Sequence, residues 1–426
     1  MVSKEYDIVI YGATGFTGLR TCQYLARTYK SNVRWAIAGR SVAKLEEVRE
    51  KLVAIDPSLS NLAIIQADSS DSEALEAMAA KTKVVISTVG PFLKYGEPLV
   101  GACVKQGTHY VDSTGEAPFV HNIIKKYHDE ALAKRVVLVP ECGFDSVPSE
   151  LGTLMVVDYL RKEHNVATKS AKLSVTNLRG SASGGTLASV CGIIEARSEI
   201  GLKAMKDQNQ LVPESVVSKV LPANISLPTI CWDKDIGKWQ GYFIMSSSNE
   251  KLVKRSHGLS IERDGVGYGP EFTYRESMSF PGFFTTTIAT LGMGLGGAAL
   301  TVGPLRRLIE KNLLPAPGTG PADEDIAKSF FTIKVIGEGA LPENVAGDKK
   351  KIAPMRAVAT IHGGDPGYFE TCRYLVEGAM CMVENEDEVR TLNKVEGGVL
   401  TPAFAFGHVL INRLKAQNVK LSVSKL

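Results

Sequence analysis

The sequence predicts an α/β protein whose N-terminal third forms a doubly wound parallel sheet, the Rossmann arrangement. Two observations carry this prediction. A glycine-rich turn follows the first apolar strand and opens a helix, and strands then alternate with helices as far as residue 140. The chain has 426 residues, whereas a single hydrophobic core stops growing near about 250–300 residues, so we expect at least one further domain.

The composition is that of an ordinary globular protein, with 44% hydrophobic and 22% charged residues. Lys and Arg (49) nearly balance Asp and Glu (46), which argues against nucleic acid as a partner. The seven cysteines are widely spaced and form no CxxC pair, so we expect neither a disulfide framework nor a metal site. The first residues carry no apolar signal segment, so secretion is not expected.

A glycine turn is expected between a first strand at 6–11 and a first helix at 19–29. Gly12 permits the turn, Gly15 has no Cβ where a pyrophosphate must approach the backbone, and Gly18 lets the helix pack closely on the strand. The positive end of the helix dipole then faces the phosphates. We therefore predict a dinucleotide site formed by Gly12, Thr14, Gly15, Phe16, Thr17 and Gly18.

The ends of the next two strands indicate which dinucleotide binds. Arg40 follows the second strand, 33–38, at a place where an NAD enzyme usually has a carboxylate for the ribose 2′-hydroxyl. An arginine suits a 2′-phosphate, which favours NADP over NAD; the alternative is an arginine that only caps the loop. Asp68 follows the third strand, 62–66, and is expected to reach the adenine amino group, to cap the helix that begins near Asp71, or both.

A fourth strand, 83–88, ends at Val89, Gly90 and Pro91. This turn lies at the carboxyl edge of the sheet, where the nicotinamide half of a dinucleotide belongs, so these three residues complete the predicted cofactor site. Strands at 109–112 and 136–140, with a helix at 118–134 between them, complete the parallel sheet.

Three residues after the sixth strand are weak candidates for catalysis, namely Cys142, Asp145 and Ser146. A thiol or carboxyl group at this strand end would supply the proton that accompanies hydride transfer. The structural alternative is favoured: Asp145 and Ser146 cap the helix that begins near residue 149, and Cys142 is a small buried residue. Glu116 and His362, the latter placed on a loop, are weaker candidates for substrate contact.

Residues 277–305 contain no charged residue, and Arg306 and Arg307 follow them. The length would permit a membrane span, but Pro281, three consecutive threonines and six glycines argue against one. We expect first a buried segment or a homodimer interface, second a peripheral contact with a membrane or lipid droplet, and last a span.

The final residues, Ser424, Lys425 and Leu426, match the address that the peroxisomal import receptor reads. They follow the polar residues 417–420 and are expected to form an exposed tail. The predicted location is the peroxisome or its glycosome equivalent, with a lipid droplet or the cytosolic side of a membrane as the alternative.

Several strings together resemble those of the saccharopine dehydrogenase-like oxidoreductases, a family that includes trans-acting enoyl reductases. They are dense over residues 6–152 and sparse between about 200 and 390. The strings are Gly12–Gly18, Ala38-Gly39-Arg40, Thr88–Phe92, Asp112–Glu116, Cys142–Ser149 and Gly397–Pro402.

The resemblance implies a dinucleotide-binding Rossmann domain in residues 1–150 and an α+β substrate or dimerisation domain, built on a mainly antiparallel sheet, in residues 151–400. Residues 401–426 would form a helix that returns to the first domain, followed by the tail. The alternation at 330–338 and 355–362 fits strands, and the periodicity at 367–383 and 404–417 fits helices.

The function implied is NADP-dependent hydride transfer to an apolar enoyl or carbonyl group of a lipid-related substrate, in lipid or glycolipid metabolism. A saccharopine-type substrate carries three carboxylates and needs converging cations, for which Arg179 and Arg197 are the candidates. The remaining alternative is a nucleotide-binding scaffold on a lipid surface that performs no turnover.

Overall fold

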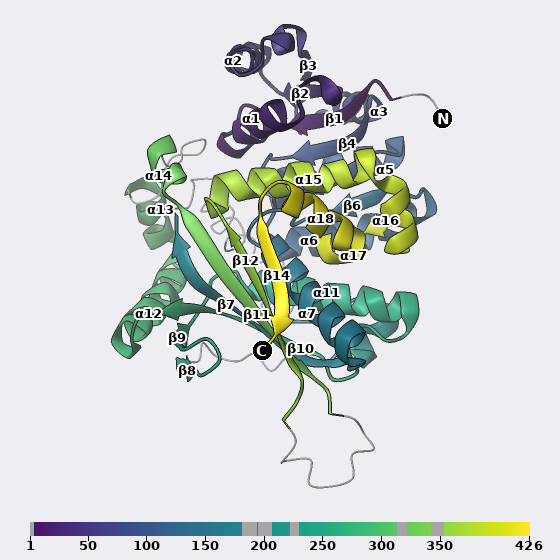
Figure 1. The fold of residues 1–426 in the computed structure, drawn as a ribbon. Helices are drawn as coiled ribbons and strands as arrows, with labels where there is room; N and C mark the ends of the chain where they lie inside the picture. The colour runs from purple at the N-terminus through teal and green to yellow at the C-terminus, as the bar shows by residue number, and fades with distance from the viewer. Residues whose placement is uncertain (1–3, 181–193, 195–206, 222–229, 313–321, 342–352) are drawn as a thin grey trace.

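The computed structural model describes residues 4–180, 194, 207–221, 230–312, 322–341 and 353–426. Two seven-stranded sheets organise this part of the chain (Figure 1). The first is parallel and the second is mainly antiparallel, as the sequence and its family resemblance predict.

The first sheet has the strand order β13-β6-β5-β4-β1-β2-β3. All strands are parallel, and the order in which the chain adds them reverses between β1 and β4. Its central strands are continuous apolar runs, for example 8–10 and 84–86, because both of its faces are buried. The strands are β1 (Tyr6–Tyr11), β2 (Trp35–Gly39), β3 (Ala63–Gln66), β4 (Thr82–Ser87), β5 (His109–Asp112), β6 (Val137–Val139) and β13 (Gly398–Val399).

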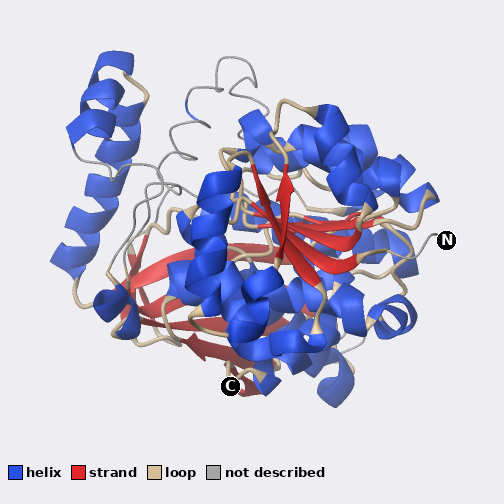
Figure 2. Ribbon diagram, turned by 90° about the horizontal axis from the view of Figure 1, so that it is seen from above, coloured by secondary structure: helices blue, strands red, loops and turns tan. Residues whose placement is uncertain are grey.

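Helices cover both faces of this sheet (Figure 2). One face carries α3 (Ser72–Ala80), α5 (Glu97–Gln106) and α6 (Ala117–Ala133). The other carries α1 (Phe16–Tyr29), α2 (Val42–Val53) and α15 (Thr371–Glu384), a helix from much later in the chain. The elements predicted between residues 6 and 140 are therefore present, with small shifts at their ends. Short helices lie in the connections, namely η1 (Lys30–Asn32), η2 (Pro57–Asn61) and α4 (Phe92–Tyr95).

The second sheet has the strand order β14-β12-β11-β7-β10-β9-β8, and β7 and β10 are its parallel pair. Helices α7 (Val147–His164) and α11 (Ser246–Asp264) pack on it. The strands are β7 (Thr168–Arg179), β8 (Cys231–Asp233), β9 (Lys238–Gly241), β10 (Thr273–Phe280), β11 (Phe330–Gly339), β12 (Arg356–Gly363) and β14 (Lys420–Lys425). The remaining helices are η3 (Glu214–Lys219), α12 (Phe283–Leu300), α13 (Gly303–Asn312), α14 (Asp323–Ala327), η5 (Pro366–Glu370), α16 (Glu386–Leu392), α17 (Pro402–Ala405) and α18 (Gly407–Ala416).

The C-terminal part of the chain enters both sheets. Strand β13 pairs with β6 in the first sheet, and α15 packs on the same sheet, although the division predicted at residue 150 assigns both to the second domain. Strand β14 pairs with β12 in the second sheet, so Ser424 and Lys425 belong to an edge strand rather than to a free tail. Leu421 and Val423 point toward the core and hold the strand on the sheet, because alternate residues of a strand face the same side. The side chains of the last three residues are exposed.

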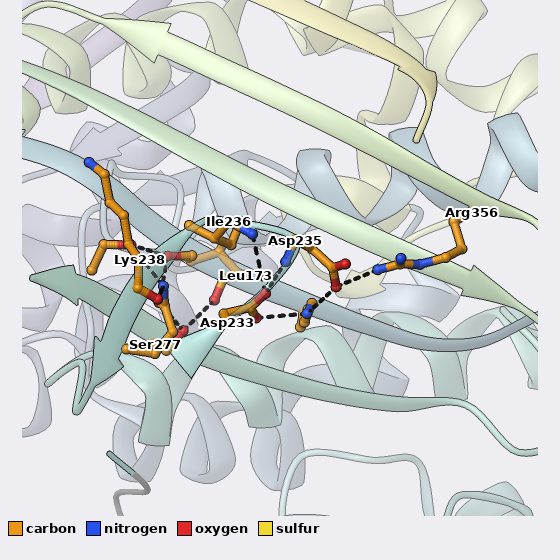
Figure 3. A network of polar contacts seen from close by, with 11 residues as sticks. Leu173, Asp233, Asp235, Ile236, Lys238, Ser277 and Arg356 are labelled. Carbon is orange, nitrogen blue, oxygen red and sulfur yellow. Dashed lines mark hydrogen bonds and ion pairs between the residues drawn. The ribbon is translucent and has the colours of Figure 1, made fainter. Parts of the chain in front are cut away.

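An ion-pair cluster ties the turn between β8 and β9 to the rest of the second sheet (Figure 3). Lys172 Nζ lies 2.7 Å from a carboxylate oxygen of Asp233 and 2.7 Å from one of Asp235. Arg356 also pairs with Asp235. The Arg356 hydrogen bond is the main reason why the pKa of Asp235 is lowered to about 2.

Helix α12 corrects the expectation of a buried segment at 277–305. Among the described helices it is the one long and apolar enough to cross a membrane by length and composition, yet only 11% of it is buried inside the chain. Phe284 is 79% exposed, and Ile288 and Leu295 are each 72% exposed. The helix contacts the body through Thr286 and Thr290, on the face opposite to this apolar stripe.

Candidate cofactor and active site

The glycine turn after β1 has the geometry expected of a dinucleotide-binding turn. Gly12 has a φ of +91°, a left-handed value that favours glycine, and a Cβ there would lie 2.7 Å from Thr88 Oγ1 and from Val89 Cγ2. A Cβ at Gly18 would overlap the carbonyl oxygen of Gly12, so α1 packs this closely only with glycine. A Cβ at Gly15 would have one neighbour, Gly12 O at 3.3 Å, so the space beside Gly15 is open.

The start of α1 presents a cradle that suits an anion. Gly15 is the N-cap residue, and no side chain caps the helix. The Phe16 ring packs edge-on against Tyr368, with centroids 4.7 Å apart, and the Arg20 guanidinium carbon lies 3.8 Å from the Phe16 ring centroid. Thr14 is exposed, and the carbonyl group of Thr17 accepts from the Thr21 hydroxyl. The residues predicted to bind pyrophosphate thus surround one open helix end.

Arg40 and Asp68 lie together at the ends of β2 and β3. The Arg40 side chain is exposed, as binding of a 2′-phosphate requires. Asp68 accepts hydrogen bonds from the Ser70 N–H (2.9 Å) and hydroxyl (2.6 Å); these bonds, and then the charge of Arg40, lower its pKa. Asp68 does not cap α3, because Asp71 is the N-cap and accepts from Ala74 N at 3.0 Å. The capping alternative for Asp68 is therefore wrong.

The turn at Val89, Gly90 and Pro91 is fixed by a buried carboxylate. Glu116 accepts hydrogen bonds from Phe92 N at 3.0 Å and from Leu93 N at 2.8 Å. These two N–H groups lie in the first turn of α4, so Glu116 takes the part of an N-terminal cap. It positions the predicted nicotinamide turn, rather than standing free for substrate.

The three catalytic candidates after β6 are not arranged as a capping group. Ser146 occupies the N-cap position of α7 without a side-chain cap bond, because its hydroxyl donates instead to Asn249 Oδ1 at 2.9 Å. The backbone carbonyl group of Asp145 accepts a hydrogen bond from Asn249 Nδ2 at 2.7 Å. Burial raises the pKa of the Asp145 side-chain carboxyl group to about 6. Cys142 is fully buried against α15, and its thiol lies 3.7 Å from Tyr374 O. Burial raises the pKa of that thiol well above its usual value.

Two buried acids at the same sheet edge were not among the catalytic candidates from sequence. Asp112 ends β5 and accepts from the Tyr110 hydroxyl at 2.8 Å, Thr114 N at 2.9 Å and Glu141 N at 3.0 Å. Glu141 follows β6, and its Oε1 accepts from the Ser248 hydroxyl at 2.8 Å. Burial raises the pKa of Asp112 to about 7 and that of Glu141 to about 8. A charged residue directly after a buried strand is the signal that could have found both.

Helix α11 supplies the side-chain partners of Glu141 and Ser146 and the donor to the Asp145 carbonyl group, and sequence reasoning missed it as well. It is buried along most of its length although its residues are largely polar, so hydrophobic periodicity gives no signal. Asn249 also donates to Glu276 Oε2 at 2.9 Å and to Ser149 Oγ at 3.2 Å. Lys251 donates to Gln210 Oε1 at 3.0 Å, and burial lowers its pKa to about 8.

The remaining candidates lie elsewhere in the structure. His362 is in strand β12, not on a loop, and its Nδ1 is 3.0 Å from Thr332 Oγ1. Arg179 ends β7 with an exposed side chain, while Arg197 lies outside the described residues. Within the described ranges, no group of three or more His, Cys, Asp or Glu residues is placed to hold a metal ion.

Comparison with known proteins shows which family the chain resembles. Residues 8–139 match the model of the saccharopine dehydrogenase NADP-binding domain. A Mycobacterium tuberculosis protein that bears the provisional name of a trans-acting enoyl reductase is 33% identical over 435 residues, covering 99% of this chain and 98% of its own. The trans-acting enoyl reductase of Mycobacterium ulcerans is 32% identical over 452 residues, 99% of both chains.

The fold agrees with these relationships. The L-Glu-forming saccharopine dehydrogenase of Saccharomyces cerevisiae superposes with a TM-score of 0.53 at 12% identity, over 99% of this chain and 100% of its own. The open cradle beside Gly15 and the exposed cation at Arg40 fit a phosphorylated dinucleotide. With relatives this similar over the full length and a matching NADP-binding domain, the chain belongs to the saccharopine dehydrogenase-like family of NADP-dependent oxidoreductases.

Proposed function

We propose that this protein uses NADPH to reduce a carbon–carbon or carbon–oxygen double bond of an apolar, acyl-type substrate. The observation that carries the proposal is a pair of fully buried carboxyl groups at the carboxyl edge of the first sheet, Asp112 and Glu141, whose pKa values are raised to about 7 and about 8. Acids that stay protonated near neutral pH are suited to give a proton to a reduced substrate. The two mycobacterial relatives named for enoyl reduction support the same choice.

A saccharopine-type substrate fits this edge poorly. Three carboxylates would require several cations, whereas the charged groups that raise the pKa of Glu141 at this edge are the acids Asp112, Asp145 and Glu150. The neighbouring acids would repel a substrate carboxylate or have to bind it in protonated form. An uncharged acyl group carries no such cost.

Each part of the cofactor has residues suited to hold it. The pyrophosphate would lie against Gly15 at the start of α1, the 2′-phosphate near Arg40, and the nicotinamide half near the turn that Glu116 fixes. When bound, NADPH supplies the hydride. The chain orients the cofactor and provides the proton.

The test combines binding with turnover. We expect saturable NADPH binding by fluorescence, weaker binding of NADH, and NADPH oxidation with a trans-2-octenoyl thioester. L-saccharopine with NADP should give no reduction of NADP. Turnover of saccharopine, with none of the thioester, would reject the acyl proposal and favour the amino-acid dehydrogenase.

A second candidate role, association with a lipid surface, is favoured by α12. Its apolar stripe of Phe284, Ile288, Leu291 and Leu295 is exposed, and the helix carries no charge. Arg307 in the following helix, α13, is exposed and would attract anionic headgroups near such a surface. We propose that this stripe brings the protein to a membrane or lipid droplet that holds its substrate; the alternative occupant is a second copy in a homodimer.

Flotation separates these occupants. The double variant Ile288→Glu/Leu295→Glu should no longer float with oleoyl-lipid vesicles, while Leu392→Glu, at an exposed leucine of α16, should float like the unaltered protein. Equal flotation of all three would reject lipid contact. A dimer in solution that the double variant converts to monomer would assign the stripe to a second copy.

We also propose that the last three residues serve as a peroxisomal address. Their side chains are exposed, while Ser424 and Lys425 pair with β12 and Leu426 N donates to Arg356 O at 3.0 Å. Deleting Leu426 from an N-terminally tagged fluorescent fusion should disperse a punctate signal. Unchanged puncta would contradict the proposal.

A further inference from the structure

Glu141 has a backbone conformation that a glutamate seldom adopts. Its φ is +57°, in the left-handed region, and its N–H donates to Asp112 Oδ1 at 3.0 Å. Left-handed backbone at a residue with a side chain costs free energy and persists where surrounding contacts hold it. Here the hydrogen bond to Asp112 holds the residue at the end of β6.

The carboxyl group of Glu141 is only half satisfied. The residue is 0% exposed, and Oε1 accepts from Ser248, whereas Oε2 has no hydrogen-bond partner in the described structure. An unpaired buried oxygen is costly, more so when it is charged. A protonated carboxyl reduces that cost and presents an O–H group for a ligand.

The place of Glu141 matches that of a proton donor. It lies at the carboxyl edge of the parallel sheet, two strands from β4, after which the predicted nicotinamide turn begins. With neighbouring strands about 4.8 Å apart, Glu141 is roughly 10 Å along that edge from the turn. The reacting bond of a substrate belongs on the same edge.

Groups from four sides face this carboxyl. Asp112 on β5, Asp145 after β6 and Glu150 on α7 disfavour its ionisation through their charges, after burial, which is the largest effect. Lys251 on α11 lies close enough for the charge of Glu141 to act on it. Ser248 and Lys251 would therefore stabilise the carboxylate that remains once a proton has left.

We propose that Glu141 is the proton donor of the reduction, with Ser248 and Lys251 as positioning residues. The inference rests on the proposed function. The substrate's C=C or C=O π bond breaks, one of its atoms accepts the hydride from NADPH, and the other takes the proton from Glu141 Oε2. NADPH is oxidised, the substrate is reduced, and Glu141 regains a proton from solvent.

The test compares Glu141→Gln with the matched control Glu377→Gln. Glu377, on α15, is also a fully buried acid, but both of its oxygens have partners: Oε1 accepts from the Tyr24 hydroxyl and Oε2 accepts from Arg413 Nε. We expect Glu141→Gln to lower kcat for octenoyl thioester reduction by about 100-fold or more, with unchanged NADPH affinity, and Glu377→Gln to stay within about threefold. Melting temperatures identify any variant that fails to fold.

Infrared difference spectra give a readout that needs no turnover. Subtracting the spectrum of Glu141→Gln from that of the unaltered protein should leave one protonated carboxyl band at about pH 6 that fades above about pH 8, because the bands of Asp112 and the other buried acids are common to both proteins and cancel. A normal kcat in Glu141→Gln would overturn the assignment of Glu141 and leave the reductase proposal standing. An unaltered protein without reductase activity would instead reject the reductase proposal. If no carboxyl band is assigned to Glu141 in the unaltered protein, its role as the holder of the proton is overturned, whatever the kinetics show. Glu141→Asp should restore part of the activity with its pH dependence.

Discussion

The hydroxyl group of Ser146 donates a hydrogen bond of 2.9 Å to the side-chain oxygen of Asn249. The amide nitrogen of Asn249 then donates to Asp145 O, Ser149 Oγ and Glu276 Oε2. One buried amide therefore joins the loop after β6, helix α7 and strand β10. This junction connects the edge of the first sheet to the second sheet.

Replacing that amide should be costly. Asn249→Leu leaves the buried Ser146 hydroxyl and the half-buried Glu276 carboxylate without one hydrogen bond each, and we expect a loss of about 2–4 kcal/mol in the free energy of unfolding. Urea unfolding measures the change. Ser247→Ala, at an exposed position of the same helix, should change stability by no more than about 0.5 kcal/mol. A similar small effect for both variants would contradict a joining role for Asn249.

Arg40 should decide between the two dinucleotides. Arg40→Ala removes the exposed cation at the end of β2, and we expect NADPH affinity to fall about 10–100-fold while NADH affinity changes little. Fluorescence titration with both cofactors checks the result. An equal loss for both would show that Arg40 supports the loop instead of reading the 2′-phosphate.

Gly18 should tolerate no side chain. A Cβ at this position overlaps Gly12 O, so Gly18→Ala has to push α1 away from the turn. We expect a marked loss of NADPH binding and a lower melting temperature. The control is Gly292→Ala in α12, where a Cβ meets nothing within 4 Å and alanine favours the helix. Normal binding by Gly18→Ala would contradict the packing argument.

The ion-pair cluster around Asp235 predicts loss of stability in acid. The folded-state pKa of Asp235 is about 2, below its ordinary value of 3.8, chiefly because of Arg356. A lowered pKa stabilises the fold above about pH 4, and this contribution disappears as the pH falls through about 2. We expect Asp235→Asn to cost about 1–2 kcal/mol at neutral pH and almost nothing near about pH 2. A constant difference across that range would contradict the assignment.

Local patterns account for what the sequence predicts correctly. The Rossmann sheet follows from apolar strands with a glycine turn at the first of them, because these features depend on neighbouring residues alone. Gly12 and Gly18 lie beside one another because a tight turn and the first turns of α1 separate them, and the sequence shows that spacing directly. The second sheet was expected through family resemblance, since its strands at 330–339 and 356–363 are the two with clear alternation.

Long-range contacts account for what was missed. The role of Glu141 depends on its hydrogen bond with Ser248, which is 107 residues away in the chain. Helix α11 is buried because β10, α7, η3, α17 and α6 pack around it, and these elements are far apart in the sequence. Residues 424–426 were expected to form an exposed tail because they match a targeting signal, and their pairing with β12 depends on residues far away in the chain. Residues 277–305 were expected to form a buried segment or a homodimer interface because they carry no charge; the chain itself leaves α12 exposed, and composition does not say what covers a helix.

Strand β13 determines when the first sheet can be completed during protein synthesis. Gly398 and Val399 pair with Val137 and Leu138, so the edge of the nucleotide-binding sheet stays open until the ribosome has made residues 398 and 399. The glycine turn and the first strands can form early, but β6 exposes an unpaired edge for the whole intervening period. An unpaired strand edge is a template for pairing with another polypeptide, so a partly made chain that stops before residue 398 would be open to aggregation at β6.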